Sequence, residues 1–280
     1  MRLSIRHTTR YNFSQPVVHA LQRLRLTPKE TQGQQILNWN LDFTNAQPEL
    51  EYDDQHFNTV TLIAVEPGVS EVIVTCSGEV QTENALGVIG RHSGHLPLWS
   101  FLGHTKTTKP GPKLRALLRD VDATLEDGEL AYLDRVSAHI LDQVAYETGK
   151  TDVGTHAEDA IAAGHGVCQD HAHIFISAAR LAGLPARYVS GYLMMDDRIE
   201  QDATHAWAEA YVAGMGWVGF DISNGIRPDD RYVRVATGRD YKDAAPITGI
   251  SFGSLEETLT VDVAVEQQQQ QDQGQQQEQQ

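Results

Sequence analysis

Three polar residues in the second half of the chain have the types and surroundings that nucleophilic catalysis needs: Cys168, His205 and Asp221. A thiol attacks a carbonyl carbon as its thiolate, and both the first turn of a helix and a neighbouring imidazolium favour that form. A carboxylate on the second ring nitrogen holds the histidine in the required tautomer. The set therefore predicts a nucleophile, a base and a carboxylate that orients the base.

The hydrophobic pattern predicts a helix that would carry the cysteine. Within residues 164–184 apolar side chains recur at helical spacing after Cys168. Gly183 is suited to the end of a helix, and Pro185 prevents the helix from continuing. We therefore expect Cys168 in the first turn of this helix.

Two alternating segments after this helix are expected to carry the other two residues. Residues 204–212 and 217–222 alternate as strands on either side of a glycine-rich turn. Antiparallel pairing of these strands would bring Asp221 toward His205. The alternation would place three side chains on one face of the first strand: His205, Trp207 and Glu209.

The rest of the chain divides near residues 100–110. Before this point the segments are short and alternating, which predicts antiparallel strands at 2–13, 17–26, 36–43, 60–65 and 71–80. A cluster of proline and glycine at 109–112 separates them from helical patterns at 114–121, 130–144 and 156–163. Further strands are expected at 186–194 and 258–265.

Several motifs resemble a known family. Gly166-Val167-Cys168-Gln169-Asp170, Gly183-Leu184-Pro185-Ala186-Arg187, Thr204-His205-Ala206-Trp207 and Gly216-Trp217-Val218-Gly219-Phe220-Asp221 resemble the core of the bacterial transglutaminase-like superfamily. Arg23-Leu24-Arg25-Leu26-Thr27-Pro28 resembles the N-terminal region that accompanies such cores. The resemblance implies a papain-like enzyme of protein or peptide substrates, with Cys168, His205 and Asp221 as its catalytic triad.

These patterns together predict an α+β protein. An antiparallel β-sandwich-like N-terminal domain is expected at residues 1–102, followed by a papain-like, transglutaminase-like core at 103–255. A C-terminal strand is expected at 256–266. Residues 267–280 contain eleven glutamines and almost no apolar side chains, which predicts a disordered tail.

The oxyanion that forms during acyl transfer needs hydrogen-bond donors. Papain-like enzymes use a glutamine a few residues before the cysteine, but here Ala163-Gly164-His165 stand upstream. The backbone N–H of Cys168 is one expected donor. Tyr146 and Gln169 are the two candidates for the second.

Structural roles compete with the catalytic one at several positions. Cys76 lies inside an alternating strand and is expected to be a buried core residue. Asp221 would also suit the cap of the turn that follows it. Arg187 is expected either in an internal ion pair or lining the cleft.

A metal site is the other interpretation of the cysteine's neighbourhood, because His165, His171 and His173 lie near Cys168 in the sequence. Residues two apart on a helix do not share a face, so His171 and His173 would diverge. We expect neither a metal nor a cofactor.

Composition excludes some classes of function. The formal charge of −16 argues against a nucleic-acid partner, and no apolar run is long enough for a membrane helix. The first residues have no apolar core of the signal-peptide kind, and two cysteines make no disulfide framework. These features predict a cytoplasmic protein.

The sequence leaves three functions open. The first is hydrolysis of amide bonds through a thioester, as a peptidase or amidase, which is slightly favoured because water needs no second binding site. The second is a transglutaminase, in which an amine accepts the acyl group. The third is a binding module that keeps the fold without the chemistry.

Overall fold

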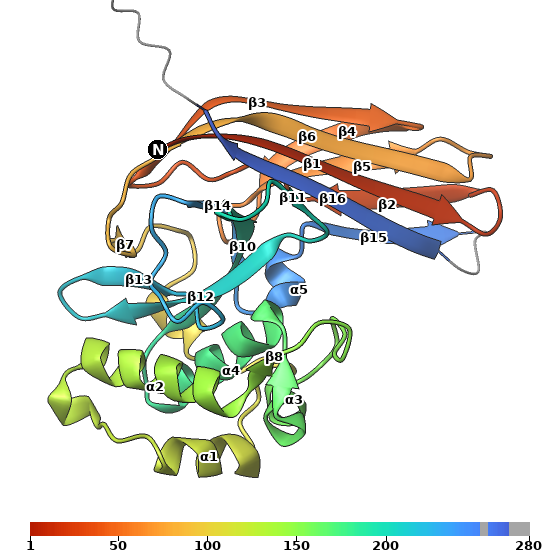
Figure 1. The fold of residues 1–280 in the computed structure, drawn as a ribbon. Coiled ribbons are helices and arrows are strands. Elements are labelled where there is room, and N and C mark those ends of the chain that lie inside the picture. Colours follow the sequence, from red (N-terminus) through yellow and green to blue (C-terminus); the bar gives the residue numbers. More distant parts are fainter. Residues whose placement is uncertain (253–256, 269–280) are drawn as a thin grey trace, which may run out of the picture.

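The computed structural model describes residues 1–252 and 257–268, and most of its regular structure is β with few helices. Two sheets lie at one end, most of the helices lie at the other, and a third sheet separates them (Figure 1). The helices are α1 (Pro112–Arg119), α2 (Glu129–Gln143), α3 (Ala157–Ala163), α4 (Cys168–Leu181) and α5 (Tyr241–Ala244), with 3₁₀ turns at Leu98–Phe101 and Leu125–Asp127.

The first sheet has the order β11-β16-β1-β6-β3 and the second β15-β2-β5-β4. Their strands are β1 (Arg2–Phe13), β2 (His19–Leu24), β3 (Gln34–Thr44), β4 (Ala46–Asp53), β5 (Thr59–Val65), β6 (Glu71–Thr82), β11 (Glu200–Gln201), β15 (Ile247–Phe252) and β16 (Glu257–Gln267). Apolar side chains from both sheets, among them Leu24, Ile63 and Val74, pack into one core. The β16 strand pairs antiparallel with β1, so the C-terminal part of the chain returns to the N-terminal sheet.

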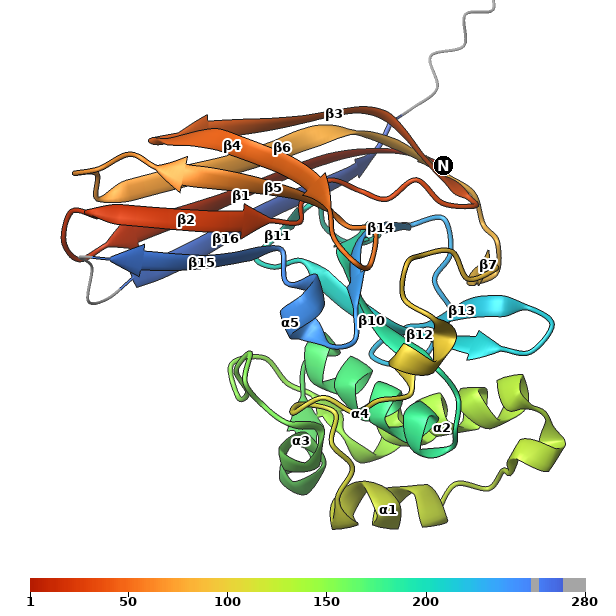
Figure 2. The same ribbon diagram turned by 180° about the vertical axis from the view of Figure 1, so that it is seen from behind.

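The third sheet, which we call the core sheet, has the order β14-β10-β12-β13-β7. It consists of β7 (Val88–Gly90), β10 (Ala186–Leu193), β12 (His205–Val212), β13 (Gly216–Phe220) and β14 (Tyr232–Gly238). Helix α4 packs against β12, where alternate alanines form part of the same apolar cluster as the buried side chains of the helix: Ala206, Ala208 and Ala210. Figure 2 shows the same layers from behind. The opposite face of β12 carries His205, Trp207 and Glu209, as the alternation predicts.

Most predicted elements are confirmed in position. Helix α4 ends before Gly183, whose φ of 83° suits glycine, and the alternation of β1 gives it one buried face. The sequence did not reveal β4, which is an exposed edge strand with Pro48 at an irregularity of its pairing with β5. The β14 strand was also missed. A last short pair, β8 (Ala145–Tyr146) and β9 (His165–Gly166), is parallel.

The C-terminal strand ends one residue later than predicted. Gln267, which the sequence pattern places in the tail, pairs with Leu3, and the backbone N–H of Gln268 donates to Arg2. Backbone pairing with β1 does not require apolar side chains, so the glutamines can extend the strand. The remainder of the predicted tail, residues 269–280, lies outside the described residues.

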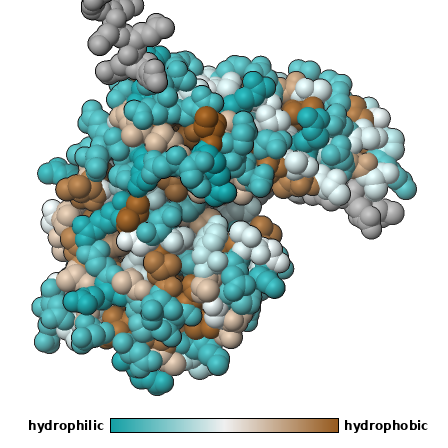
Figure 3. All heavy atoms as spheres, viewed as in Figure 1, coloured by the Kyte–Doolittle hydropathy of each residue, from teal (hydrophilic) through white to brown (hydrophobic). Residues whose placement is uncertain are grey.

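The surface visible in Figure 3 is mostly hydrophilic, with hydrophobic residues scattered over it. Such scattered residues are normal for the surface of a folded protein. Among residues 1–252 and 257–268, no helix has both the length and the apolar character needed to cross a bilayer.

Candidate active site

The structure brings Cys168, His205 and Asp221 together at one end of the core sheet. Cys168 is the first residue of α4, His205 is the first residue of β12, and Asp221 directly follows β13. The Nε2 of His205 lies 2.6 Å from Oδ2 of Asp221. Cys168 lies close enough to the same imidazole to contribute to its raised pKa. His205 therefore contacts the carboxylate and lies near the thiol.

Asp221 is fully buried and accepts hydrogen bonds from several donors. The Tyr232 hydroxyl donates to Oδ2 at 2.7 Å, and the Asn224 side-chain amide donates to the same oxygen at 2.7 Å. Burial alone would raise the pKa of Asp221, but its hydrogen bonds, with that from His205 the largest, outweigh this effect and lower the pKa. The carboxylate therefore stays ionised in the interior.

His205 is buried with 8% of its surface exposed, and burial alone would lower its pKa. Its hydrogen bond with Asp221 and its proximity to Cys168 instead raise the pKa to about 10. The imidazole therefore carries its second proton at neutral pH. A charged ring between a thiol and a carboxylate can stabilise a thiolate and later deliver a proton.

Asp170 fixes the start of the helix that carries the cysteine. Its Oδ2 accepts from the backbone N–H of Val167 at 2.8 Å and from the Thr151 hydroxyl at 2.7 Å. A Cβ on Gly166 would lie 2.7 Å from the Cβ of Asp170, so only glycine allows this close approach. The sequence therefore builds the turn before Cys168 from a small residue and a capping carboxylate.

Trp207 packs between the histidine and the tyrosine that supports Asp221. Its ring lies near-parallel to His205 with centroids 6.2 Å apart, and edge-on to Tyr232 at 5.4 Å. Only 2% of the tryptophan surface is exposed. Trp207 therefore restricts both rings and forms a wall behind the imidazole.

His171 supports the site from one turn further along α4. The imidazole donates from Nε2 to the carbonyl of Val144 at 2.9 Å, and its Nδ1 accepts from the Ser223 hydroxyl at 2.8 Å. These contacts tie α4 to the chain before Tyr146 and to the turn after Asp221. His173, also buried, instead accepts the backbone N–H of Tyr241 at 3.1 Å.

The two candidates for a second oxyanion donor differ in their surroundings. The Gln169 amide donates to the carbonyl of Val153 at 3.2 Å, so this donor is engaged away from Cys168. Tyr146 is 50% exposed, and burial of its other half together with the nearby Cys168 raises the pKa of its hydroxyl. The Tyr146 hydroxyl therefore keeps its proton at neutral pH and, unlike the Gln169 amide, remains a candidate for the second donor.

Three residues with an expected structural role have the contacts that such a role requires. Asp221 receives the Asn224 backbone N–H at 3.3 Å, so it caps the turn and also contacts His205. Arg187 forms an ion pair with Glu209 at 2.6 Å, in agreement with one of its two predicted roles. Cys76 is fully buried in β6, where burial raises the pKa of its thiol to about 11.

Two supporting residues were not identified from the sequence. Asn224 lies in the turn after Asp221. The sequence pattern indicates only that Asp221 could cap this turn. Tyr232 comes from β14, a strand that was not predicted, so nothing indicated that its hydroxyl would reach Asp221.

Comparison with known proteins bears on the family and the fold of the chain. Residues 115–222 match the family model of the transglutaminase-like superfamily, and residues 3–81 match that of the bacterial transglutaminase-like N-terminal region. An uncharacterized protein from Mycobacterium leprae is 28% identical over 95% of this chain and 98% of its own length. An uncharacterized protein from Mycobacterium tuberculosis is 38% identical, over 47% of this chain and 45% of its own length.

A solved structure has the same fold. The crystal structure of a "Putative Cysteine Protease" from Cytophaga hutchinsonii aligns with a TM-score of 0.75 over 95% of this chain and 90% of that one, at 22% identity. The two family matches cover both the sheet-rich N-terminal part and the segment that carries Cys168, His205 and Asp221. The chain therefore belongs to the transglutaminase-like superfamily and carries the bacterial N-terminal region of that family.

Proposed function

We propose that this protein is a cysteine-dependent acyl-transfer enzyme that cleaves amide bonds of peptides or proteins through a thioester. Cys168 is the nucleophile, His205 the acid and base, and Asp221 the residue that orients and charges His205. The observation that carries the proposal is the position of His205, which hydrogen bonds to Asp221 at 2.6 Å and lies near the Cys168 thiol, which contributes to its raised pKa.

The reaction follows from the proton on His205. The Cys168 sulfur attacks the carbonyl carbon, and the oxyanion is held by the backbone N–H of Cys168 and the Tyr146 hydroxyl. The C–N bond then breaks as His205 gives its proton to the leaving amine. Water, deprotonated by His205, attacks the thioester, which releases a carboxylic acid and restores the thiol. Asp221 stays ionised throughout, as its lowered pKa allows.

Hydrolysis is the preferred outcome because it needs no acceptor site beyond access of water to the thioester. A transglutaminase would instead use a primary amine and release ammonia from a glutamine side chain. We also propose that the chain is divided into a β-sandwich-like N-terminal domain and a papain-like α+β core.

This function is tested by measuring whether the acyl group passes to water or to an added amine. Glutamine-containing peptides and proteins are incubated with and without a primary amine, and carboxylate product, ammonia and incorporated amine are measured by mass spectrometry. We expect carboxylate product that dilute amine hardly diverts. Cys168→Ala should abolish product, whereas Cys76→Ala should retain it because Cys76 is buried in β6. Efficient amine incorporation would favour the transglutaminase, and no turnover of a broad substrate panel would favour the binding module.

A further inference from the structure

A cavity of about 560 Å³ lies apart from the candidate active site. It is enclosed by the loop that contains Lys29, by the loop that contains His56, and by Arg187 and Arg234 of the core sheet. None of Cys168, His205 and Asp221 is among its lining residues. On β12, Glu209 is four residues from His205, about 13 Å along the strand at 3.3 Å per residue. The cavity is therefore a second concave site, not the cleft of the thiol.

The wall formed by the core sheet carries more positive than negative charge. Arg187 donates from Nε to Glu209 at 2.6 Å, and Arg234 donates from Nε to the other oxygen of Glu209 at 2.5 Å. Arg234 also reaches Glu209 from Nη2 at 3.1 Å. Glu209 is fully buried, and the two arginines are 7% and 6% exposed. Two guanidinium ions thus share one carboxylate where solvent screens them poorly.

Part of the hydrogen-bonding capacity of this wall is unused. Among residues 1–252 and 257–268, both Nη atoms of Arg187 and Nη1 of Arg234 make no hydrogen bond to the protein, and none of them is fully buried, so they are accessible from the cavity. The Arg187 guanidinium also stacks on the Trp217 ring, 3.9 Å from its centroid, which fixes the plane of its free donors. Guanidinium donors that face a cavity and no protein partner are available to an acceptor that enters it.

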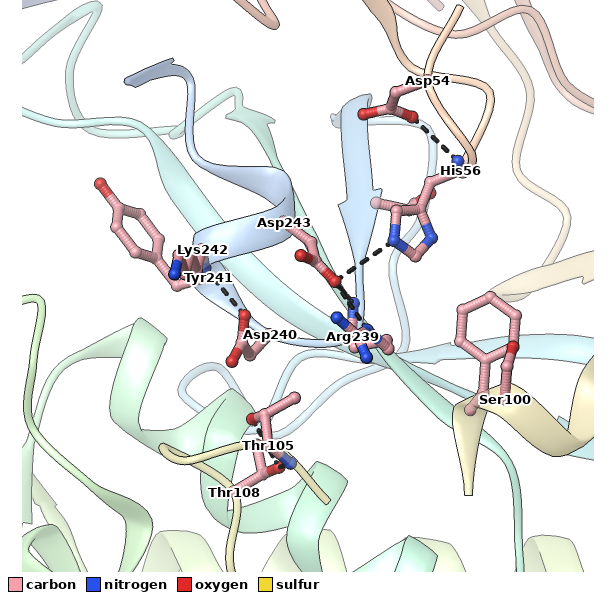
Figure 4. Close-up of polar contacts among 12 residues, drawn as sticks. Asp54, His56, Ser100, Thr105, Thr108, Arg239, Asp240, Tyr241, Lys242 and Asp243 are labelled. Atoms are coloured by element: carbon pink, nitrogen blue, oxygen red, sulfur yellow. Dashed lines mark hydrogen bonds and ion pairs between the residues drawn. The ribbon is translucent and has the colours of Figure 1, made fainter. Parts of the chain in front are cut away.

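The loop wall of the cavity adds Lys29 as a further donor and places His56 beside it. Lys29 donates from Nζ to the carbonyl of His56 at 3.0 Å and to that of Phe57. His56 is 7% exposed; its Nε2 lies 3.3 Å from Asp243 and its backbone N–H donates to Asp54 at 2.9 Å (Figure 4). Within the described part of the chain, the buried Nδ1 of His56 has no partner.

The positive potential of the cavity acts on Lys29. Burial, together with the charges of Arg234 and Arg187, lowers the pKa of Lys29 to about 7, although Asp54 and Glu209 oppose this effect. Arg91 is exposed and lines the same cavity, so it adds a further cation. The only acidic lining residue among the described ones is Glu30, which is exposed. The lining therefore combines three arginines and a lysine, which is about half protonated at neutral pH, with one carboxylate.

We propose that this cavity is a binding site for a small oxyanion ligand, one that carries a carboxylate or phosphate group, held by Arg187, Arg234 and Lys29 with Arg91 at the exposed side. The free guanidinium donors match the planar oxygen pairs of such groups, which arginine binds in a bidentate manner. The volume lies within the range of about 300–1,000 Å³ that small-molecule sites occupy. The site is independent of the reaction proposed for Cys168.

Isothermal titration of the full chain tests this site, with inorganic phosphate in one arm and citrate in the other. Ionic strength is held constant with sodium chloride, because chloride screens non-specific attraction equally in both arms. We expect saturable binding with one ligand per chain in at least one arm. Binding of phosphate alone identifies a phosphate ligand, and binding of citrate alone identifies a carboxylate.

Two variants connect the binding to the cavity. Arg187→Lys keeps the charge but removes the fork of donors, and it should weaken binding about tenfold or more. Arg91→Gln changes an exposed residue, so it should fold normally and weaken binding several-fold. The matched control is Arg115→Gln, an exposed arginine on α1 that does not line the cavity.

Two results would overturn the proposal. One is the absence of saturable binding in both arms with the unmodified chain. The other is binding that Arg91→Gln and a folded Arg187→Lys retain at full affinity, since the oxyanion would then lie elsewhere. If Arg187→Lys does not fold, the comparison of Arg91→Gln with Arg115→Gln decides.

Discussion

The Tyr232 hydroxyl donates a hydrogen bond of 2.7 Å to Oδ2 of Asp221, the same carboxylate oxygen that faces His205. Tyr232 is the first residue of β14, and Asp221 directly follows β13. Both residues are buried. A hydrogen bond from a neutral donor helps to keep a buried carboxylate ionised without neutralising its charge. Tyr232 is therefore a positioning residue that acts through Asp221.

Removal of this hydroxyl should weaken the site without dismantling it. In Tyr232→Phe the carboxylate loses one hydrogen bond but keeps those from His205 and Asn224. We expect about a tenfold fall in turnover and a loss of about 1–2 kcal/mol in the free energy of unfolding. Steady-state kinetics and urea denaturation at pH 7 measure the two effects.

The control for this variant is Tyr132→Phe, which removes a hydroxyl from a partly buried tyrosine on α2. It should leave turnover unchanged. Equal kinetic effects from both variants would show that the Tyr232 hydroxyl has no special part in the reaction.

Asp221→Asn should have a much larger effect on turnover. The amide is close to the carboxylate in shape but carries no charge, so His205 loses its tautomer lock and its counter-charge. We expect turnover to fall about a hundredfold or more while the chain remains folded. A folded Asp221→Asn protein with wild-type turnover would remove Asp221 from the proposed triad.

His173 should make the protein sensitive to acid. Burial lowers the pKa of this histidine to about 4, and its unprotonated Nε2 accepts the backbone N–H of Tyr241. In the unfolded chain His173 is protonated below its ordinary pKa of 6.5, whereas in the folded chain it is protonated only below about pH 4. Stability is therefore full above pH 6.5 and falls between pH 6.5 and 4, by on the order of 3 kcal/mol for this group.

The variant that checks this effect is His173→Gln, in which an amide oxygen can still accept from Tyr241 but does not titrate. Urea denaturation between pH 7 and 4 should give a flatter dependence for His173→Gln than for the unmodified chain. His19→Gln, at an exposed histidine on β2, should not flatten it. Identical slopes for all three proteins would contradict the assignment.

Deletions at the C-terminal end should separate β16 from the glutamines that follow it. Deletion of 269–280 removes mainly glutamine and should change the melting temperature little, because such a segment buries almost no apolar surface. Deletion from residue 257 removes the whole partner of β1 along one edge, including the buried Val263 and Val265. It should lower the melting temperature strongly or prevent folding, and thermal denaturation of both deletions distinguishes these outcomes.

The sequence was most informative where the pattern is local. The start and end of α4 follow from its apolar spacing and from Gly183, and the strand that begins at His205 follows from alternation. The β4 strand was missed because it is exposed, charged and interrupted by Pro48. Every residue of β14 is buried, including Arg234, whose charge in the sequence favours an exposed segment over a strand of the core sheet.

Long-range pairing limited what the sequence could predict about the site. Tyr232 reaches Asp221 only because β14 folds beside β10, and the register of these strands is not written in either segment alone. The same holds for Arg187 and Arg234, which come from neighbouring strands and meet at Glu209 on a third. An acidic partner for Arg187 was expected, but the competing second arginine was not foreseen.

The central claim is that His205 activates Cys168 as the nucleophile, and alkylation in mild acid tests it most directly. The folded protein is treated with iodoacetamide at pH 5.5, and the labelled positions are identified by peptide mass spectrometry. The chain has two cysteines, and Cys76 serves as an internal control because it is fully buried and its pKa is raised to about 11. We expect rapid labelling of Cys168 alone, and a loss of about tenfold or more in this rate in His205→Ala. Slow labelling of Cys168 at pH 5.5, or a rate that His205→Ala leaves unchanged, would contradict the activation of Cys168 by His205.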